Sequence, residues 1–171
     1  MKKLVSRVFA FLAAVTVVAT AFTTSAANEV LAEENFGTGG RLYFSNGYSV
    51  ALNWADPYDG YAVQSICDAW DSAVMETSYI YGTTLIADHA GQGFNIIKSY
   101  GVGSTVEIRD AWGGCTTYVC VGYYPNATWV DGVVTLPDGR NAWAGDAGLW
   151  MKTCNDSSGY SNTVSYWTPA W

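Results

Sequence analysis

Short segments with β-strand character, separated by turns, run through residues 41–167 and limit the fold more than any other feature. Valine, threonine and aromatic side chains, which favour strands, fill segments bounded by glycine, asparagine and aspartate. Asn46-Gly47 is typical of a hairpin turn, and Asp131-Gly132 suggests another. Strands are predicted at residues 41–44, 48–54, 83–87, 104–109, 116–123, 129–136, 148–153 and 163–167. The sequence therefore predicts a mostly β domain.

One segment has the spacing of an amphipathic helix. Its apolar residues recur at intervals of three and four and share one face: Val63, Ile66, Trp70 and Val74. Asp68 falls off this stripe. The preceding residues 56–60 could form a calcium loop with two aspartates, but aspartate, proline and glycine together more often form a turn. We expect one or two short helices, no metal site and no cofactor.

The N-terminus predicts export. Lys2, Lys3 and Arg7 precede an apolar run at residues 8–22, and small residues follow it. This order is that of a secretory signal peptide, and the run is shorter than the roughly 18–20 residues that cross a bilayer. We predict a signal peptide at 1–27 cleaved after Ala26 or Ala27, a leader at 28–40 and a folded domain at 41–171. An uncleaved signal anchor is the alternative.

The charge of the chain limits its partners. Cleavage would remove three of the eight lysines and arginines and none of the fifteen acidic residues, which leaves a net charge near −10. Nucleic acids and anionic lipids both require clustered positive charge. A nucleic-acid partner is therefore excluded, and the domain is expected to be secreted or to lie on the extracellular surface.

Two predicted strands end in residues that could form a thiol–imidazole pair. His89, the single histidine, follows the strand at 83–87, and Cys154 follows the strand at 148–153. With a period of two, Cys154 shares a strand face with Lys152 and Trp150. A neighbouring imidazolium stabilises a cysteine thiolate, which is the nucleophilic form. Without further evidence, the alternative is a surface histidine and a buried or disulfide-bonded cysteine.

These phrases resemble the motifs of sortases. Residues 86–89 with Phe94 are similar to the family's histidine phrase, 101–108 resembles the strand that follows, and Leu149-Trp-Met-Lys-Thr-Cys154 resembles the cysteine box. Trp150 and Met151 depart from that box. The order and spacing fit over residues 41–171. The resemblance implies a closed β-barrel with one or two short helices, with Cys154 and His89 as catalytic residues.

The resemblance also implies an activity. A sortase-like cysteine transpeptidase would attack a peptide bond in a sorting signal, form a thioacyl enzyme and pass the acyl group to a cell-wall or pilin amine. Its partners would be a protein or peptide bearing that signal and the amine acceptor. Two alternatives are a sortase fold that binds a peptide or protein without catalysis, and a secreted β-domain whose exposed aromatic residues bind carbohydrate.

The chain departs from the family where an arginine is expected after the cysteine. Residues 155–171 contain neither Arg nor Lys. Three residues could replace it toward the substrate or the oxyanion: Asn162 as an amide donor, Arg140 from the loop before the cysteine strand, and Lys152 about 7 Å along the strand from Cys154. For each, a different role as an ordinary polar or charged side chain is the alternative.

Two neighbours of the pair are expected to support it. Asp88 stands where sortases usually have a glycine, and Thr153 precedes the cysteine. The Asp88 carboxylate either acts on the imidazole or points to solvent.

The four cysteines, Cys67, Cys115, Cys120 and Cys154, allow three disulfide pairings. On one continuous strand, Cys115 and Cys120 would face opposite sides and lie too far apart to be bonded. Cys67 is expected to be a small buried residue beside the helix stripe.

Overall fold

The computed structural model describes residues 35–78, 82–142 and 147–171 of the chain. The predicted signal peptide and most of the leader lie outside the described residues. Within the described part, no helix is both long and apolar enough to cross a membrane.

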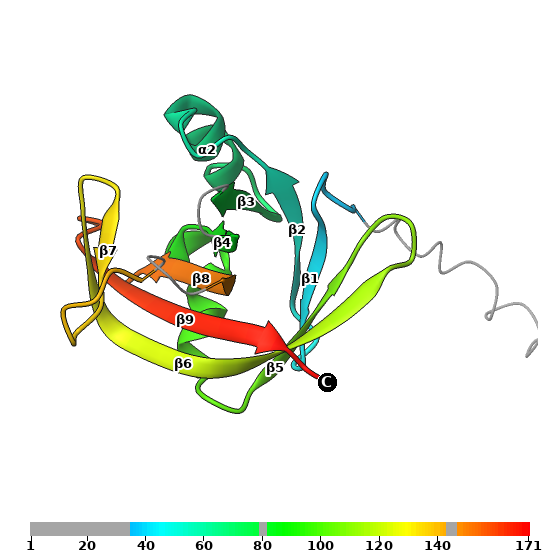
Figure 1. Ribbon diagram of the computed structural model, residues 1–171. Coiled ribbons are helices and arrows are strands. Elements are labelled where there is room, and N and C mark those ends of the chain that lie inside the picture. Colours follow the sequence, from blue (N-terminus) through cyan, green and yellow to red (C-terminus); the bar gives the residue numbers. More distant parts are fainter. Residues whose placement is uncertain (1–34, 79–81, 143–146) are drawn as a thin grey trace, which may run out of the picture. The chain divides into compact units, whose positions relative to one another are not determined.

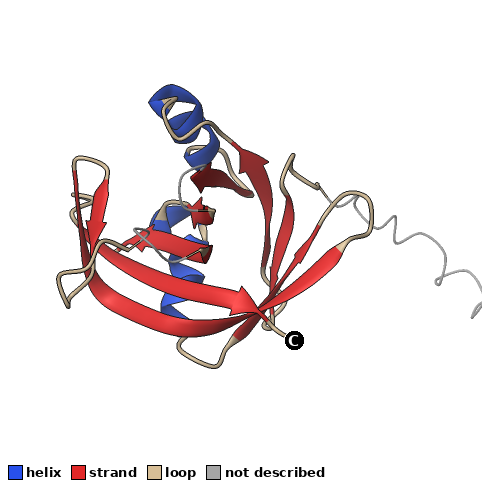
Figure 2. Ribbon diagram, viewed as in Figure 1, coloured by secondary structure: helices blue, strands red, loops and turns tan. Residues whose placement is uncertain are grey.

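The described residues form a closed β-barrel. Eight strands close in the order β5-β1-β2-β3-β4-β8-β9-β6, because β5 also pairs with β6, and β7 extends the sheet beyond β6. Figures 1 and 2 show the strands curving around a common interior, with the helix α2 above them. The strands are β1 (Gly40–Phe44), β2 (Ser49–Trp54), β3 (Ser72–Ser78), β4 (Thr83–Ala87), β5 (Thr105–Arg109), β6 (Cys115–Val130), β7 (Val133–Thr135), β8 (Gly148–Cys154) and β9 (Ser161–Pro169). The predicted mostly β barrel is confirmed.

Both predicted turns form. Strands β1 and β2 pair antiparallel around a turn in which Gly47 has a φ of +89°. Strands β6 and β7 meet at Asp131-Gly132, with φ values of +51° and +80°. In the Asp131-Gly132 turn both central residues have a positive φ, which is the geometry of hairpin turns that match the strand twist.

Alternate side chains of β8 pack into two different hydrophobic cores, in agreement with the predicted period of two. Leu149 and Met151 pack into the larger core, whereas Trp150 packs into a second cluster with residues of β6, β7 and β9. Lys152 and Cys154 therefore lie on the Trp150 face, away from the larger core.

The observed helix is shorter than the helix predicted from the apolar stripe. Helix α2 spans Gly60–Cys67; Asp59 caps its start by accepting a hydrogen bond from the Ala62 N–H at 3.0 Å. Trp70 lies beyond the helix and is 79% exposed, and Val74 is buried in β3. The prediction that the helix continues past Cys67 was therefore wrong. From Ser72 onward, the backbone hydrogen bonds are made by pairing of β3 with β2 and β4 and not by a longer helix.

Two short 3₁₀ helices follow β4 and close one end of the barrel: η1 (Ala90–Gln92) and η2 (Phe94–Ser99). Gly93 joins them with a φ of +104°, and a Cβ there would lie 2.5 Å from the Tyr48 hydroxyl. Phe94 and Ile97 are fully buried in the larger core. This packing fixes the chain directly after His89.

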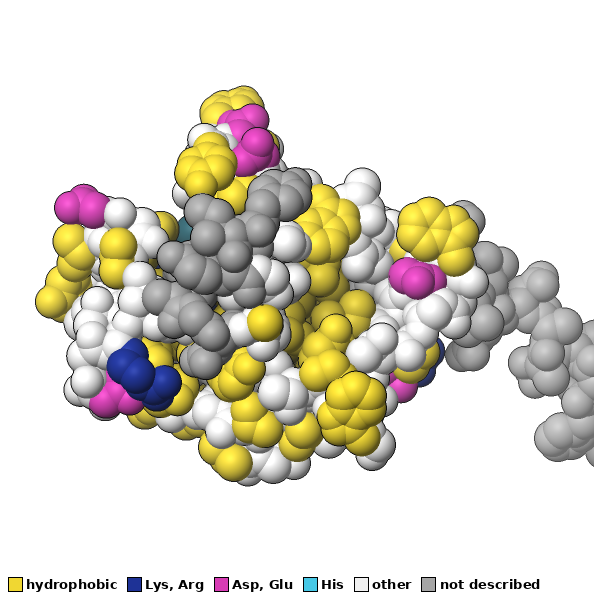
Figure 3. All heavy atoms as spheres, viewed as in Figure 1, with side chains coloured by type: hydrophobic (Ala, Val, Ile, Leu, Met, Phe, Trp, Pro, Cys, Tyr) yellow, Lys and Arg dark blue, Asp and Glu magenta, His cyan; other side chains and the backbone are white. Residues whose placement is uncertain are grey.

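Charged side chains are sparse on the face seen in Figure 3, where hydrophobic and uncharged polar side chains predominate.

Candidate active site

The register between β4 and β8 brings the ends of both strands together. The strands run parallel, and Ala87 pairs with Lys152. The ladder continues past β4, since the Asp88 N–H donates to the Lys152 carbonyl at 3.4 Å and the Thr153 hydroxyl donates to the Asp88 carbonyl at 3.0 Å. His89 follows two residues after the end of β4, and Cys154 is the last residue of β8, so the parallel register brings both to the same edge of the sheet.

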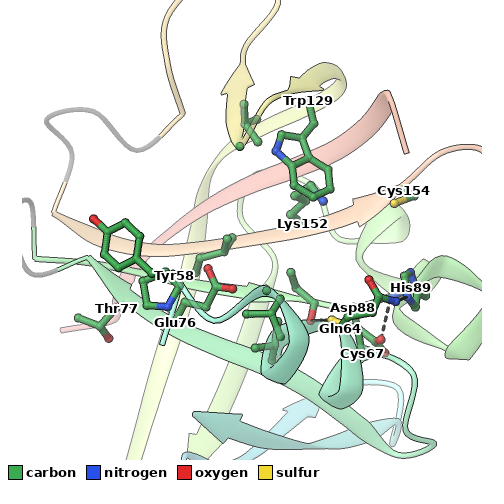
Figure 4. A pocket seen from close by; sticks show the side chains of 18 of the residues that line it. Tyr58, Gln64, Cys67, Glu76, Thr77, Asp88, His89, Trp129, Lys152 and Cys154 are labelled. Carbon is green, nitrogen blue, oxygen red and sulfur yellow. Dashed lines mark hydrogen bonds between the residues drawn. The ribbon is translucent and has the colours of Figure 1, made fainter. Parts of the chain in front are cut away.

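Both residues line one pocket of about 690 Å³. Figure 4 shows His89 and Asp88 on one side of it, Cys154 at its edge, and Lys152 beneath the Trp129 ring. Tyr58 and Glu76 line its other end. The pocket therefore joins the predicted nucleophile and base to an aromatic and charged surface.

The His89 ring is held by helix α2. Its Nε2 lies 3.1 Å from the Gln64 side-chain nitrogen and 3.3 Å from Asp68 Oδ1, and Gln64 donates to that same oxygen at 2.9 Å. Gln64 can donate to Nε2 of a neutral imidazole, and Asp68 forms an ion pair with a protonated one. The ring is 41% exposed. Nδ1 has no hydrogen bond to any residue that the structure describes.

Cys154 is a free thiol at the end of β8 and is partly exposed. No hydrogen bond within the described residues joins it to His89. Cys154 lies close enough to Lys152 to act on the pKa of the lysine. The catalytic roles of Cys154 and His89 stay predictions, and the structure brings the two residues to neighbouring positions at one pocket.

Lys152 is the candidate cation that lies in the pocket. Its side chain is buried, with the residue 8% exposed, and Nζ lies 3.9 Å from the centre of the Trp129 ring. Burial lowers the pKa of Lys152, while Cys154, Cys67 and Glu76 act in the opposite direction. Burial also raises the pKa of Glu76.

Asn162 lies directly opposite Cys154 on β9 and is fully buried. Its side-chain nitrogen donates to the carbonyls of Gly159 and Tyr160, at 2.9 and 3.0 Å. Both of its N–H groups are therefore engaged in the β8–β9 loop. An oxyanion role would require one of these bonds to break.

Arg140 does not line the pocket. Its Nε donates to Asp138 at 2.9 Å and a terminal nitrogen donates to the Tyr124 hydroxyl at 3.3 Å. The structure does not bring it together with Cys154 and His89.

Asp88 takes neither of the two positions expected of it. The residue is 4% exposed, and its Oδ1 accepts a hydrogen bond from the His89 backbone N–H at 2.6 Å, not from the imidazole. Its Oδ2 is buried without a hydrogen-bond partner. Burial raises the pKa of Asp88 to about 7. The Thr153 hydroxyl donates to the Asp88 carbonyl, and its supporting role stays a prediction.

All four cysteines are free. Cys115 and Cys120 lie on the single strand β6, the first exposed and the second buried, as predicted. Cys67 is buried, and burial raises its pKa to about 12. No disulfide therefore blocks Cys154. In residues 35–78, 82–142 and 147–171, no group of three or more His, Cys, Asp or Glu is placed to hold a metal ion.

Gln64, Asp68 and Trp129 are site residues that the sequence did not single out. Gln64 and Asp68 are four residues apart around the end of α2, and Asp68 lies off the apolar stripe. That spacing shows that the two side chains can lie close together, but it does not indicate that they contact His89 after the end of β4. Trp129 reaches the pocket from β6, 19 residues before the start of β8.

Compared by sequence, the chain matches no protein-family model and no curated protein. Its structure is similar to those of sortases. Sortase E1 from Streptomyces coelicolor, solved with a tripeptide in its active site, is 11% identical with a TM-score of 0.56, over 80% of this chain and 92% of that one. Sortase A from Corynebacterium diphtheriae is 12% identical with a TM-score of 0.52, over 77% of this chain and 60% of that one.

Sortase C1 from Streptococcus agalactiae is 14% identical with a TM-score of 0.51, over 77% of this chain and 66% of that one. The chain thus spans less than two thirds of the sortase A and sortase C1 chains. At these identities the likeness concerns the fold alone. The described part of the chain has the fold of the sortases.

Proposed function

We propose that the domain is a cysteine-dependent acyl transferase that acts on peptides, a sortase-like transpeptidase. The observation that carries the proposal is that His89 and Cys154, which follow and end the paired strands β4 and β8, line one pocket. A free, partly exposed thiol next to the chain's single imidazole is the pair that covalent acyl transfer requires.

The chemistry would run in two steps. The Cys154 thiol gives its proton to His89, and the thiolate attacks the carbonyl carbon of the peptide bond to form a C–S bond. The C–N bond then breaks, and His89 returns the proton to the departing amine. In the second step an amine attacks the thioester, forms a new amide and releases the thiol.

The substrate would be an extended peptide bearing a sorting signal, and the acceptor a cell-wall or pilin amine. Support comes from the fold, since a sortase of the same fold holds a tripeptide in its active site. Export by the predicted signal peptide would place the enzyme where such acceptors occur.

Alkylation of Cys154 tests this proposal. Iodoacetamide modification would be followed at the Cys154 peptide by mass spectrometry, in the wild-type protein and in His89→Ala. Exposed Cys115 serves as an internal thiol that is remote from the imidazole. We expect Cys154 to react faster than Cys115 at neutral pH and to lose this advantage in His89→Ala. Equal rates at Cys154 in both proteins would show that the histidine does not activate the thiol.

A second function, binding of a peptide or protein without catalysis, is favoured by one observation. Nε2 of His89 faces Gln64 and Asp68, not Cys154. The same alkylation experiment decides between the two functions, because a binding domain needs no activated thiol. A separate carbohydrate site has less support, because Tyr58 and Trp129 line the pocket of Cys154.

A further inference from the structure

The pocket contains an ammonium group that makes no hydrogen bond or ion pair with an acceptor of the described residues. The Lys152 residue as a whole is 8% exposed, but its Nζ is open to the pocket. Its contact in the protein is the face of Trp129, 3.9 Å from Nζ to the ring centre. An ammonium has three N–H donors, and donors that face a pocket can bind an oxygen atom of a ligand.

The pairing of the strands relates the positions of Trp129 and Cys154. Cys154 pairs with Asn162, which in turn pairs with Ala127 of β6. Strands β6 and β8 run in the same direction, because each is antiparallel to β9. Trp129 is two residues further along β6 than Ala127, and therefore lies beyond the level of Cys154.

Lys152 lies two residues before Cys154 on β8. Its ammonium lies under the ring of Trp129, a residue attached to β6 beyond the level of Cys154. The Lys152 side chain lies on the same face of the sheet as Cys154, and both residues line the pocket. Figure 4 shows the ammonium beneath the Trp129 ring, within the pocket that Cys154 borders. Of the described residues that line this pocket, Lys152 is the one lysine or arginine.

We propose that Lys152 is a catalytic residue whose ammonium donates to the carbonyl oxygen of the bond that Cys154 attacks. This proposal rests on the proposed function. When the thiolate adds to the carbonyl carbon, the C=O π electrons move to the oxygen, and the Lys152 N–H groups stabilise that oxyanion. When the intermediate collapses, the C=O bond re-forms and the C–N bond breaks. Lys152 neither gains nor loses a proton in this cycle.

The other two candidate donors are less suited to this role. The N–H groups of Asn162 are engaged by two loop carbonyls, and Arg140 lies outside the pocket. Trp129 is the positioning residue, since its ring holds the ammonium within the pocket that Cys154 borders.

Two reagents separate oxyanion stabilisation from thiolate formation. Iodoacetamide alkylates the thiolate by displacing iodide, without an oxyanion. 4-Nitrophenyl acetate acylates it through a tetrahedral oxyanion. Both rates would be measured at Cys154 by mass spectrometry, at a pH where alkylation has levelled off in each variant. The ratio of acylation to alkylation then reports on the oxyanion.

In Lys152→Met we expect this ratio to fall by about 100-fold, a typical effect of removing one oxyanion donor. Lys152→Arg, which keeps a cation with N–H donors, should recover most of it. Lys98→Met is the matched control, because Lys98 lies on η2 outside the pocket. The ratio at Cys115 should stay constant in every variant.

An unchanged ratio in Lys152→Met, with the thermal unfolding transition retained, would overturn the role of Lys152. A fall that Lys152→Arg and Lys152→Met share equally would also overturn it, since it would reflect packing rather than charge. Failure of the proposed function gives a different result: Cys154 of the wild-type protein would be alkylated no faster than Cys115. The ratio would still report on Lys152 in that case.

Discussion

Asp68 Oδ1 lies 3.3 Å from Nε2 of His89, so the residue that ends helix α2 meets the residue that follows strand β4. Asp68 itself does not line the pocket, so it contacts the imidazole from the side of α2. In nucleophilic sites, the base is commonly oriented by a third group in this way. In the proposed function, this contact would leave Nδ1 for the thiol.

Asp68→Asn should slow the alkylation of Cys154 at neutral pH by about two- to fivefold. The substitution removes the charge that stabilises the imidazolium but keeps an oxygen that can accept from Gln64. The effect is small because the Asp68 side chain is 62% exposed, and exposed ion pairs contribute about 0.2–1 kcal/mol. The measurement is the rate of iodoacetamide labelling as a function of pH.

Asp138→Asn is the control for this change. Asp138 also pairs with a cation at the surface, but its partner is Arg140, outside the pocket. Equal labelling rates for Asp68→Asn and Asp138→Asn would remove Asp68 from the site.

The four thiols should divide into two groups. In the native protein at pH 8, Cys115 and Cys154 should be labelled by iodoacetamide, while Cys67 and Cys120 should be protected. Cys67 and Cys120 are buried, and burial raises both pKa values, that of Cys67 to about 12. Guanidinium chloride should expose all four to labelling. Fast native labelling of Cys67 would contradict its packing against the Ala87 carbonyl.

The strands that carry the site were predictable because alternation and turns are local properties. Residues 83–87 and 148–153 have short apolar or alternating patterns, and β4 and β8 form there. The same alternation placed Lys152 on the face of Cys154. The fold class followed from these segments together with the resemblance to sortases.

The errors arose where tertiary contacts decide the structure. Strand β3 (Ser72–Ser78) has a weak β pattern, and its pairing with β2 and β4 stabilises it. The spacing of Trp70 and Val74 imitated a helix, although the first is exposed and the second is in β3. The contacts of His89 with Gln64 and of Lys152 with Trp129 join distant segments, and no local pattern encodes them.

Arg41→Met should lower the free energy of unfolding by about 2 kcal/mol. The Arg41 side chain is 11% exposed and donates to Asp71 through both terminal nitrogens, at 2.9 and 3.1 Å. It also donates to Ser49 and to the Asn35 carbonyl. Removing the guanidinium leaves these acceptors without a partner, but Asp71 is 47% exposed and can turn to water, which limits the loss.

Urea unfolding of Arg41→Met and Arg109→Met compares a buried arginine with an exposed one. Arg109 is 50% exposed, pairs with Glu107 and lies over the Tyr43 ring. Its replacement should lower the urea midpoint less than the replacement of Arg41 does, because exposed ion pairs contribute little to stability. Equal midpoints for the two variants would contradict a stabilising role for the Arg41 contacts.

Asp88 should make the fold less stable as the pH rises from about 4 to about 7. Its pKa is raised from 3.8 to about 7 because the carboxyl group is buried. Between these values the folded chain keeps a proton that the unfolded chain has lost, so the free energy of unfolding decreases with increasing pH. The difference corresponds to at most about 4 kcal/mol, reached above pH 7.

Asp88→Asn isolates this contribution, because asparagine keeps the shape and an oxygen for the His89 N–H but does not ionise. Urea unfolding of both proteins at pH 5 and pH 8 should show the variant gaining stability relative to wild type at the higher pH. Asp110→Asn is the control, since Asp110 also accepts backbone N–H groups but is less buried. The stability of this variant at the two pH values is the reference for the comparison. If Asp88→Asn behaves like this control, the Asp88 carboxyl is not held in its protonated form by burial, and its unpartnered Oδ2 must be reached by water.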